Sequence, residues 1–151
     1  DPFATSIVVP ASATFTTAEI LESPDSVNCS ALVSCFRSSV TVPGTFSPYL
    51  TVVLRVDASN IKRGTKIGSV LVSYNGLVIG DCASPTTPRT DGIPCIAKRV
   101  AYPVPRPPKG HHHDDRDSSE TAKKPGVAPS DLDGDFEWTL LNLKNGSYKV
   151  F

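Results

Sequence analysis

Apolar and polar residues alternate along most of this chain, with a period of two residues. In the stretch YLTVVLRVD, four apolar residues fall on alternate positions: Leu50, Val52, Leu54 and Val56. Side chains of a β-strand point to the two faces of a sheet in turn, so this spacing predicts a strand with one buried face. The same spacing in FRSSVTV, SVLVSY, DFEWTLL and SYKVF extends the predicted buried row to Phe36, Val40, Val42, Val70, Val72, Tyr74, Phe136, Trp138, Leu140 and Tyr148.

Two Asn-Gly pairs separate the alternating stretches. Asn75-Gly76 lies between SVLVSY and LVIG, and Asn145-Gly146 precedes SYKVF. Asn-Gly between alternating stretches is the strongest short signal for a β-hairpin, which we expect at Asn75-Gly76. At Asn145-Gly146 we expect a turn into SYKVF. Many short strands with frequent turns predict a sandwich or a barrel, and we expect a sandwich.

Two parts of the chain lack this alternation. In TTAEILES, Thr16 or Thr17 is placed to cap a short helix that ends near Pro24. The region 84–130 is rich in proline and charge and is predicted to form long loops, with a short strand CIAKRVAY between them. Its PVPRPP stretch favours a stiff polyproline conformation.

The segment DLDGDFEWTLLNLKNGSYKV resembles one found in carboxypeptidase-regulatory-like and other bacterial surface β-sandwiches. In these domains a D-x-x-G-x-F strand leads into an L-x-x-G-x-Y turn, and the matching residues here are Asp131, Gly134, Phe136, Leu143, Gly146, Tyr148 and Val150. The resemblance covers about 20 residues. It implies that the tyrosine packs where the chain changes sheets and that its hydroxyl bonds to the upstream backbone, as in a tyrosine corner.

The predicted fold class is therefore all-β: an immunoglobulin-like β-sandwich with an extended N-terminal strand and a long proline-rich loop. The resembling domains continue into another strand after the tyrosine, whereas this chain stops at Phe151. We therefore expect a sandwich that lacks its last strand, with an unpaired edge that can accept a strand from elsewhere. The expected acceptor edge consists of Tyr148, Val150 and Phe151.

The N-terminal stretch DPFATSIVVPASATFTT is a candidate for that missing strand. Its odd positions form one mostly apolar row: Phe3, Thr5, Ile7, Val9, Ala11, Ala13 and Phe15. A row of about 13 residues spans on the order of 40 Å as a strand, about twice the usual strand length. Because Pro10 donates no ladder hydrogen bond, it divides the row into two pieces, one for the chain's own sandwich and one for a neighbour.

These features predict a structural subunit of an extracellular, pilus-like filament that assembles head-to-tail by β-strand complementation. The expected partners are other copies of the chain in a homo-oligomeric helical filament. We expect residues 1–16 to form the donor strand and residues 17–151 the sandwich domain. Two alternatives remain open: a monomeric adhesion or stalk module of a surface protein, and an extracellular domain that binds a metal or another ligand.

The charge balance is compatible with self-association. Lys plus Arg and Asp plus Glu both number 15, so the formal net charge is zero, which disfavours a nucleic-acid or anionic-membrane partner. No apolar run approaches the roughly 20 residues of a membrane span. The chain contains no methionine and opens at Asp1, which predicts a processed mature form.

The cysteines and sequons favour an extracellular, secreted protein. Four cysteines allow three pairings, and we expect the two that are local in sequence, Cys29 with Cys35 and Cys82 with Cys95; free buried thiols are the alternative. Two N-x-S/T sequons make Asn28 and Asn145 candidates for glycosylation. Hydroxyl groups of the 103–130 loop are further candidate glycan sites.

Motifs for catalysis or metal binding are weak. HHHDDRD offers His111, His113 and Asp115 as candidate metal ligands, but a solvated loop is the preferred interpretation. DLDGDFE does not fit an EF-hand, because its glycine is at the fourth position, and we expect a turn before a strand. No catalytic fingerprint is present, so neither an enzyme nor a cofactor is predicted.

Overall fold

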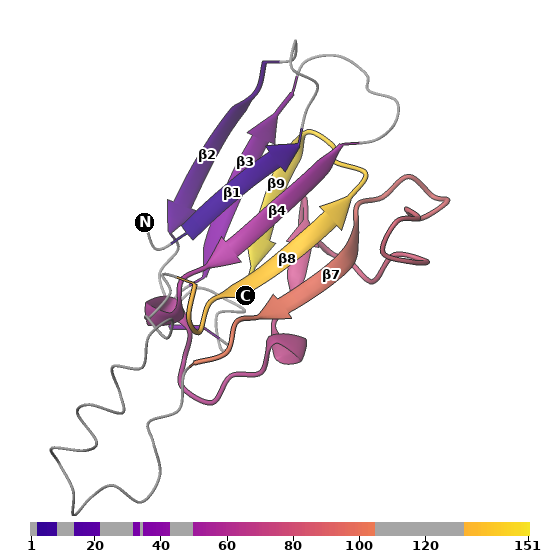
Figure 1. Cartoon of the computed structure of the whole chain (residues 1–151). Helices are drawn as coiled ribbons and strands as arrows, with labels where there is room; N and C mark the ends of the chain where they lie inside the picture. Colours follow the sequence, from indigo (N-terminus) through magenta and orange to yellow (C-terminus); the bar gives the residue numbers. More distant parts are fainter. Residues whose placement is uncertain (1–2, 9–13, 22–31, 34, 43–49, 105–131) are drawn as a thin grey trace, which may run out of the picture.

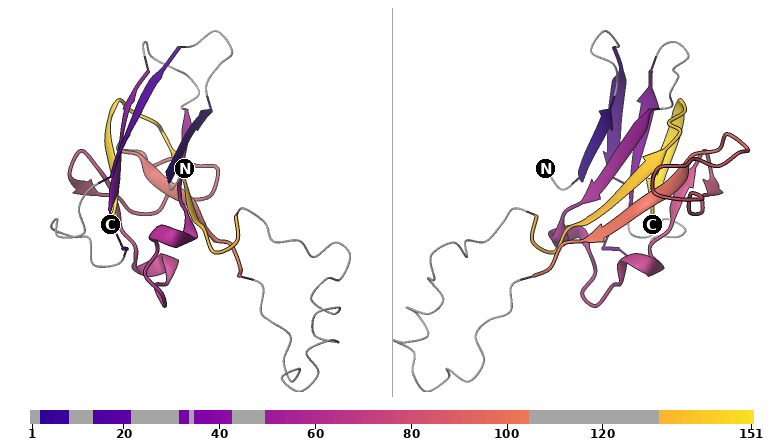
Figure 2. Two further views of the ribbon diagram at one scale, coloured as in Figure 1. Left: turned by 90° about the vertical axis from the view of Figure 1, so that its left-hand side faces the viewer. Right: turned by 45° about the vertical axis from the view of Figure 1, so that its right-hand side comes forward.

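The computed structural model describes residues 3–8, 14–21, 32–33, 35–42, 50–104 and 132–151. These residues form two antiparallel β-sheets that pack face to face (Figure 1), and the turned views of Figure 2 show the two layers. A single large hydrophobic core draws side chains from both sheets. The all-β prediction is therefore confirmed, and the arrangement is that of a β-sandwich.

The strands fall into one four-stranded and one five-stranded sheet. The first has the order β1-β4-β8-β7, with β1 Phe3–Val8, β4 Thr51–Val56, β8 Phe136–Leu141 and β7 Cys95–Ala101. The second has the order β2-β3-β9-β5-β6, with β2 Thr16–Leu21, β3 Phe36–Thr41, β9 Gly146–Val150, β5 Val72–Tyr74 and β6 Leu77–Val78. Two single-turn 3-10 helices, η1 Ala58–Asn60 and η2 Ile67–Ser69, connect β4 to β5. The N-terminal segment therefore supplies one edge of each sheet.

The predicted buried row is confirmed. β4 and β8 pair with Leu54 opposite Trp138, and both of these side chains are fully buried between the sheets. Tyr74 is half-buried, and the other predicted residues are buried: Phe36, Val40, Val42, Leu50, Val52, Leu54, Val56, Val70, Val72, Phe136, Trp138, Leu140 and Tyr148. The period-two pattern thus identified the inward face of the strands that carry it.

The Asn75-Gly76 hairpin is also confirmed. It joins β5 to β6, and its two residues have φ angles of 47° and 83°. Positive φ at both central residues is the requirement of a type I′ turn, which matches the twist of the flanking strands. CIAKRVAY forms β7, as expected.

The predicted helix in TTAEILES is wrong. Residues Thr16–Leu21 form β2, which runs antiparallel to β3 from Thr16 opposite Thr41 to Leu21 opposite Phe36. A short isolated helix is marginal in water because its first turn is costly to nucleate. Pairing along β3 gives the same residues a ladder of backbone hydrogen bonds, so tertiary context overrides the capping signal.

The tyrosine corner is present where the chain passes from β8 to β9. Tyr148 is fully buried, and its hydroxyl donates to the carbonyl of Lys144 at 2.7 Å and accepts from the Lys144 amide at 3.0 Å. Gly146 permits the close packing here, because a Cβ atom on it would lie 2.6 Å from Asn75 Oδ1 and 2.7 Å from the Tyr74 ring. The hydroxyl contact implied by the resemblance is therefore confirmed.

Burial of Tyr148 makes the fold sensitive to alkali. Burial raises the pKa of Tyr148 above its ordinary value near 10.0, and the hydrogen bond to the Lys144 carbonyl opposes this only in part. The stability that Tyr148 provides is therefore present below about pH 10 and declines as the pH rises further, because only the unfolded chain ionises readily there. We expect Tyr148→Phe to lower the free energy of unfolding by about 1–3 kcal/mol near neutral pH, with a smaller difference from the native chain above about pH 10.

Urea titrations of both chains at the two pH values measure this effect. A difference between native chain and variant that stays the same at both pH values would contradict it.

Candidate assembly site at the N-terminal strand

β1 forms the outer edge of the four-stranded sheet. It runs antiparallel to β4 over its whole length, from Phe3 opposite Val56 to Val8 opposite Thr51. The odd-numbered residues Phe3, Thr5 and Ile7 face the other sheet, whereas Ser6 and Val8 are exposed. The first part of the predicted donor row is therefore a strand with one inward face, and in this structure it belongs to the chain's own sheet.

An aromatic pair holds the start of β1 in place. The rings of Phe3 and Phe36 stack with their centroids 4.3 Å apart and an interplanar angle of 18°, and both side chains are buried. Phe36 belongs to β3, so this contact joins the two sheets. Stacked aromatic pairs contribute about 0.5–1.5 kcal/mol beyond the area that they bury.

A polar pair, Thr5 with Ser38, lies next to the aromatic pair, two residues further along β1 and β3. Thr5 Oγ1 and Ser38 Oγ are 2.5 Å apart, and Ser38 is fully buried. A buried hydroxyl without a partner is costly, so Ser38 favours the register that places Thr5 beside it. This pair is not among the residues predicted from the sequence, although the sequence carries a signal for it: Ser38 is the one polar residue between Phe36 and Val40 on the inward row of FRSSVTV.

The rest of the predicted donor row does not continue this inward face. Val9, Ala11 and Ala13 lie outside the described residues, and Phe15 precedes β2 with 47% of its surface exposed. Only Phe3, Thr5 and Ile7 are thus placed together along β1. Pro10 lies between β1 and β2 in the sequence, and both strands pair within the chain's own sheets. The expected use of one piece by a neighbouring copy stays a prediction.

The expected acceptor edge is wrong, because β9 is an interior strand. It pairs with β3 on one side and β5 on the other, and Phe151 exchanges two backbone hydrogen bonds with Leu71. Tyr148, Val150 and Phe151 are all buried. The L-x-x-G-x-Y pattern predicts the corner correctly, but residues before it in the chain, in β5, cover the far side of β9.

The strand that β1 covers is instead β4. Three β4 residues opposite the inward row of β1, namely Val52, Leu54 and Val56, are fully buried. If β1 left, β4 would present an unpaired backbone edge beside an opened core. The position that can accept a donor strand is therefore the groove between β4 and β3.

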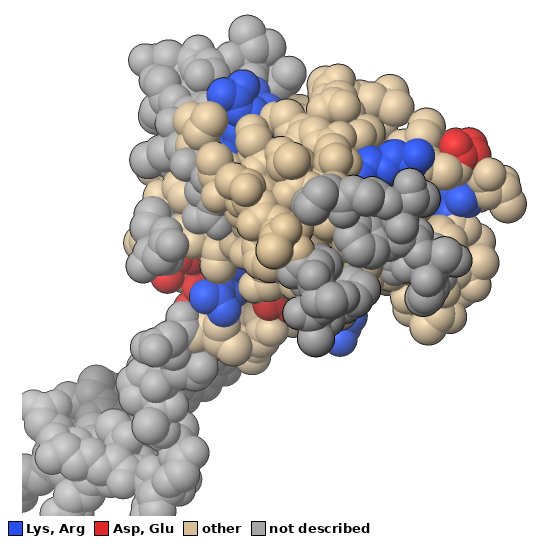
Figure 3. All heavy atoms as spheres, turned by 90° about the horizontal axis from the view of Figure 1, so that it is seen from above, with Lys and Arg blue, Asp and Glu red and all other residues tan. Residues whose placement is uncertain are grey.

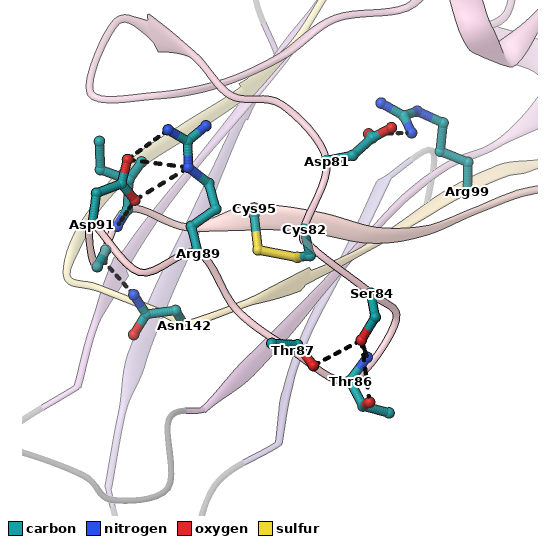
Figure 4. Close-up of a disulfide and its surroundings, with 12 residues drawn as sticks. Asp81, Cys82, Ser84, Thr86, Thr87, Arg89, Asp91, Cys95, Arg99 and Asn142 are labelled. Carbon is teal, nitrogen blue, oxygen red and sulfur yellow. Dashed lines mark hydrogen bonds and ion pairs between the residues drawn. A yellow bond between two sulfur atoms is a disulfide. The ribbon is translucent and has the colours of Figure 1, made fainter.

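A disulfide fixes the opposite side of the sandwich. Cys82 and Cys95 are bonded, with Cα atoms 4.9 Å apart, as predicted (Figure 4). Beside the bond, the Cys82 amide donates to the Ile96 carbonyl and the Ile96 amide donates to the Gly80 carbonyl, both at 2.9 Å. Cys35 is also disulfide-bonded, whereas its expected partner Cys29 lies outside the described residues. Disulfides indicate an oxidising compartment outside the cytoplasm.

The loop closed by this disulfide is organised by polar contacts. The Arg89 guanidinium binds the carboxylate of Asp91, which lowers the pKa of Asp91, and the Asn142 amide donates to the Gly92 carbonyl (Figure 4). Outside the loop, Arg99 pairs with Asp81 at 2.6 Å. These contacts fasten the loop to β7 and to the end of β8.

Replacing Cys82 and Cys95 by alanine should lower the free energy of unfolding by about 3 kcal/mol, the value for a loop of about 15 residues. The physical reason is that the unfolded chain regains the freedom that the cross-link removes. Thermal unfolding of the double variant, compared with the native chain with and without a reductant, measures the effect. An unchanged midpoint in the double variant would contradict this estimate.

Asn145, a predicted glycosylation site, has a structural role in the turn. Its side-chain oxygen accepts from the Val42 amide at 2.7 Å, and its nitrogen donates to the Val42 carbonyl at 3.0 Å. The residue itself is exposed, so glycosylation stays a prediction, and a glycan there would share the nitrogen that binds Val42. The other sequon residue, Asn28, lies outside the described residues.

The candidate metal ligands His111, His113 and Asp115 lie outside the described residues, and in the described part of the chain no three potential ligands cluster. Asp135 of DLDGDFE is buried and accepts from the Ala58 amide at 2.9 Å, so it anchors the turn before β8. The expected turn at Leu132–Gly134 is confirmed.

Charged side chains are scattered over the face of the molecule drawn in Figure 3. In the face drawn in Figure 3, cations lie in separate small groups and most of the described surface is uncharged. Within the described residues, no helix has the length and apolar character needed to cross a membrane.

A scan against family models and searches of the curated proteins and of the solved structures each found no match for this chain. The fold and the contacts of β1 are therefore the features that bear on its function.

Proposed function

We propose that this chain is a structural subunit of an extracellular filament, an immunoglobulin-like β-sandwich in which β1 is exchanged between copies. In the filament, β1 of one copy lies against β4 of the next in the register that it has within a single chain. The observation that carries the proposal is that β1 forms the edge of the four-stranded sheet and contributes Phe3 to the core. Because all copies are identical, another copy's β1 makes the same contacts.

The direction of exchange decides the form of the assembly. If two copies exchange β1 reciprocally, the result is a closed dimer, whereas head-to-tail exchange leaves one free donor and one free groove and propagates. The strand addition itself follows the known logic of edge pairing, in which backbone bonds supply affinity and side-chain pockets supply specificity. The Phe3–Phe36 stack and the Thr5–Ser38 hydrogen bond are the side-chain contacts that would supply specificity here.

A second candidate is a monomeric adhesion or stalk module. It is favoured by the pairing of β1 within its own sheet and by the interior position of β9, which together leave this side of the sandwich complete. Electron microscopy and light scattering of the intact chain and of a chain lacking residues 1–15 distinguish the two. Filaments formed only by the intact chain support exchange, and a discrete, stable monomer in the intact chain supports the module.

The register of the donor should depend on Thr5. We expect Thr5→Val to lower the free energy of unfolding by about 1–3 kcal/mol, because the buried Ser38 hydroxyl loses its partner. Ser6→Val is the matched control, since Ser6 is exposed on the same strand, and it should change stability by less than about 0.5 kcal/mol. The double variant Thr5→Val with Ser38→Ala should recover part of the loss.

Denaturant titrations of the three variants measure these differences. Equal effects of Thr5→Val and Ser6→Val would show that the polar pair does not set the register.

A further inference from the structure

Three of the four sheet edges in the described part of the chain carry features that oppose pairing with another strand. β7 has a bulge between Ile96 and Lys98, and the Gly80–Cys82 segment covers its beginning. β6 is only two residues long. β1 is bracketed in the sequence by Pro2 and Pro10. Bulges, short edges and prolines are the usual means by which proteins block edge-to-edge association.

β2 has none of these features. It is six residues long, and its sequence TTAEIL contains no proline and no cation. Thr16, Ala18 and Ile20 are exposed, Ile20 with 40% of its surface accessible, and Phe15 next to it is 47% exposed. Figure 1 shows β2 at the margin of the five-stranded sheet, with β3 on its inner side. A six-residue edge strand with no proline and no bulge is a template for another strand.

We infer that β2 pairs with β2 of a second copy, antiparallel and about a two-fold axis, so that two five-stranded sheets join into one. The register that fits best places Ala18 opposite Ala18 of the other copy. Outward residues then meet outward residues, with Thr16 opposite Ile20. Glu19 falls opposite Thr17 of the other copy.

The chemistry of Thr17 and Glu19 favours this register. Thr17 Oγ1 is buried and has no hydrogen-bond partner among the described residues, so it is a hydroxyl donor to which the pairing brings a carboxylate residue. Shifting the register so that position 19 faces itself would place two carboxylates opposite each other, which is destabilising. The zero net charge of the chain adds no long-range repulsion between copies.

This interface is independent of β1 exchange, and a locked chain separates the two. Ser6 and Val53 are register partners in β1 and β4. When Ser6→Cys with Val53→Cys is refolded and oxidised at high dilution, where chains do not meet, and the cross-linked single chains are isolated, the disulfide holds β1 in its own sheet. The locked chain cannot exchange β1. We expect it to form a dimer in sedimentation equilibrium, and this expectation holds whether or not the intact chain forms filaments.

A charge exchange at the two-fold position tests the pairing itself. In the locked chain, Ala18→Lys and Ala18→Glu each place like charges opposite each other, and each should weaken dimerisation at least about tenfold. An equimolar mixture of the two should restore it, because lysine then faces glutamate. Thr41→Lys is the matched control, since Thr41 is exposed beside Thr16 on the neighbouring interior strand, and it should leave dimerisation within about twofold.

Recovery in the mixture also shows that the single variants are folded. A locked chain that stays monomeric, an Ala18→Lys effect no larger than that of Thr41→Lys, or a mixture no stronger than its components would each overturn the inference.

Discussion

Trp138→Ala should lower the free energy of unfolding by about 3–5 kcal/mol. Trp138 is fully buried at the centre of β8, opposite Leu54 of β4, and its ring meets Phe136 edge-on with centroids 6.1 Å apart. Alanine would leave a cavity between the sheets that the surrounding side chains, held on paired strands, cannot collapse to fill. The effect is large compared with the 5–15 kcal/mol that typically stabilises a domain.

The matched control is Trp138→Phe. The indole nitrogen has no hydrogen-bond partner among the described residues, so phenylalanine loses volume without breaking a hydrogen bond. We therefore expect a smaller loss, about 1–2 kcal/mol. Because the chain contains one tryptophan, the titration is followed by far-ultraviolet circular dichroism. A loss below about 1 kcal/mol in Trp138→Ala would mean that the core is not centred on this residue.

Deletion of residues 1–8 should destabilise the isolated domain by at least about 5 kcal/mol, because it removes an aromatic core residue and uncovers a strand edge. The deletion removes Phe3 from its stack with Phe36 and exposes the β4 edge beside Val52, Leu54 and Val56. A synthetic peptide of residues 1–8 added in trans should bind the groove and raise the melting temperature with its concentration. A peptide with Phe3→Ala and Thr5→Val is the control and should bind far more weakly.

This result bears on exchange directly, since a groove that accepts the peptide also accepts another copy's β1. A deletion variant that is as stable as the native chain, or whose stability does not respond to the peptide, would contradict the proposed groove.

The sequence predicts where the strands lie and which face of each is buried better than it predicts which strands pair with each other. Period-two alternation depends on residues adjacent in the chain, so the inward faces around Leu54 and Trp138 could be identified directly. The same applies to the turn at Asn75-Gly76, where the side chains dictate the backbone angles. Tyr148 could be placed because its partner, Lys144, is only four residues away.

Features that depend on distant pairing could not be predicted in this way. Residues 16–21 have weak local preference, and only the pairing with β3 makes them a strand. The edge beside β9 was expected to be open because nothing in SYKVF indicates that β5 lies alongside it. The candidate site shows the same division: the inward row of β1 was predictable, whereas its acceptor β4 and the contact between Thr5 and Ser38 depend on the assembled sandwich.

Exchange of β1 between copies is tested most directly by the cysteine pair at positions 6 and 53. The chain with Ser6→Cys and Val53→Cys is assembled under reducing conditions, oxidised, and then separated on a denaturing gel without a reductant. If β1 is exchanged head-to-tail, each new disulfide joins two copies, and the gel shows a ladder of covalent multimers that disappears when the disulfides are reduced. Oxidation that yields only cross-linked single chains would mean that β1 stays in its own sheet and would contradict the filament proposal.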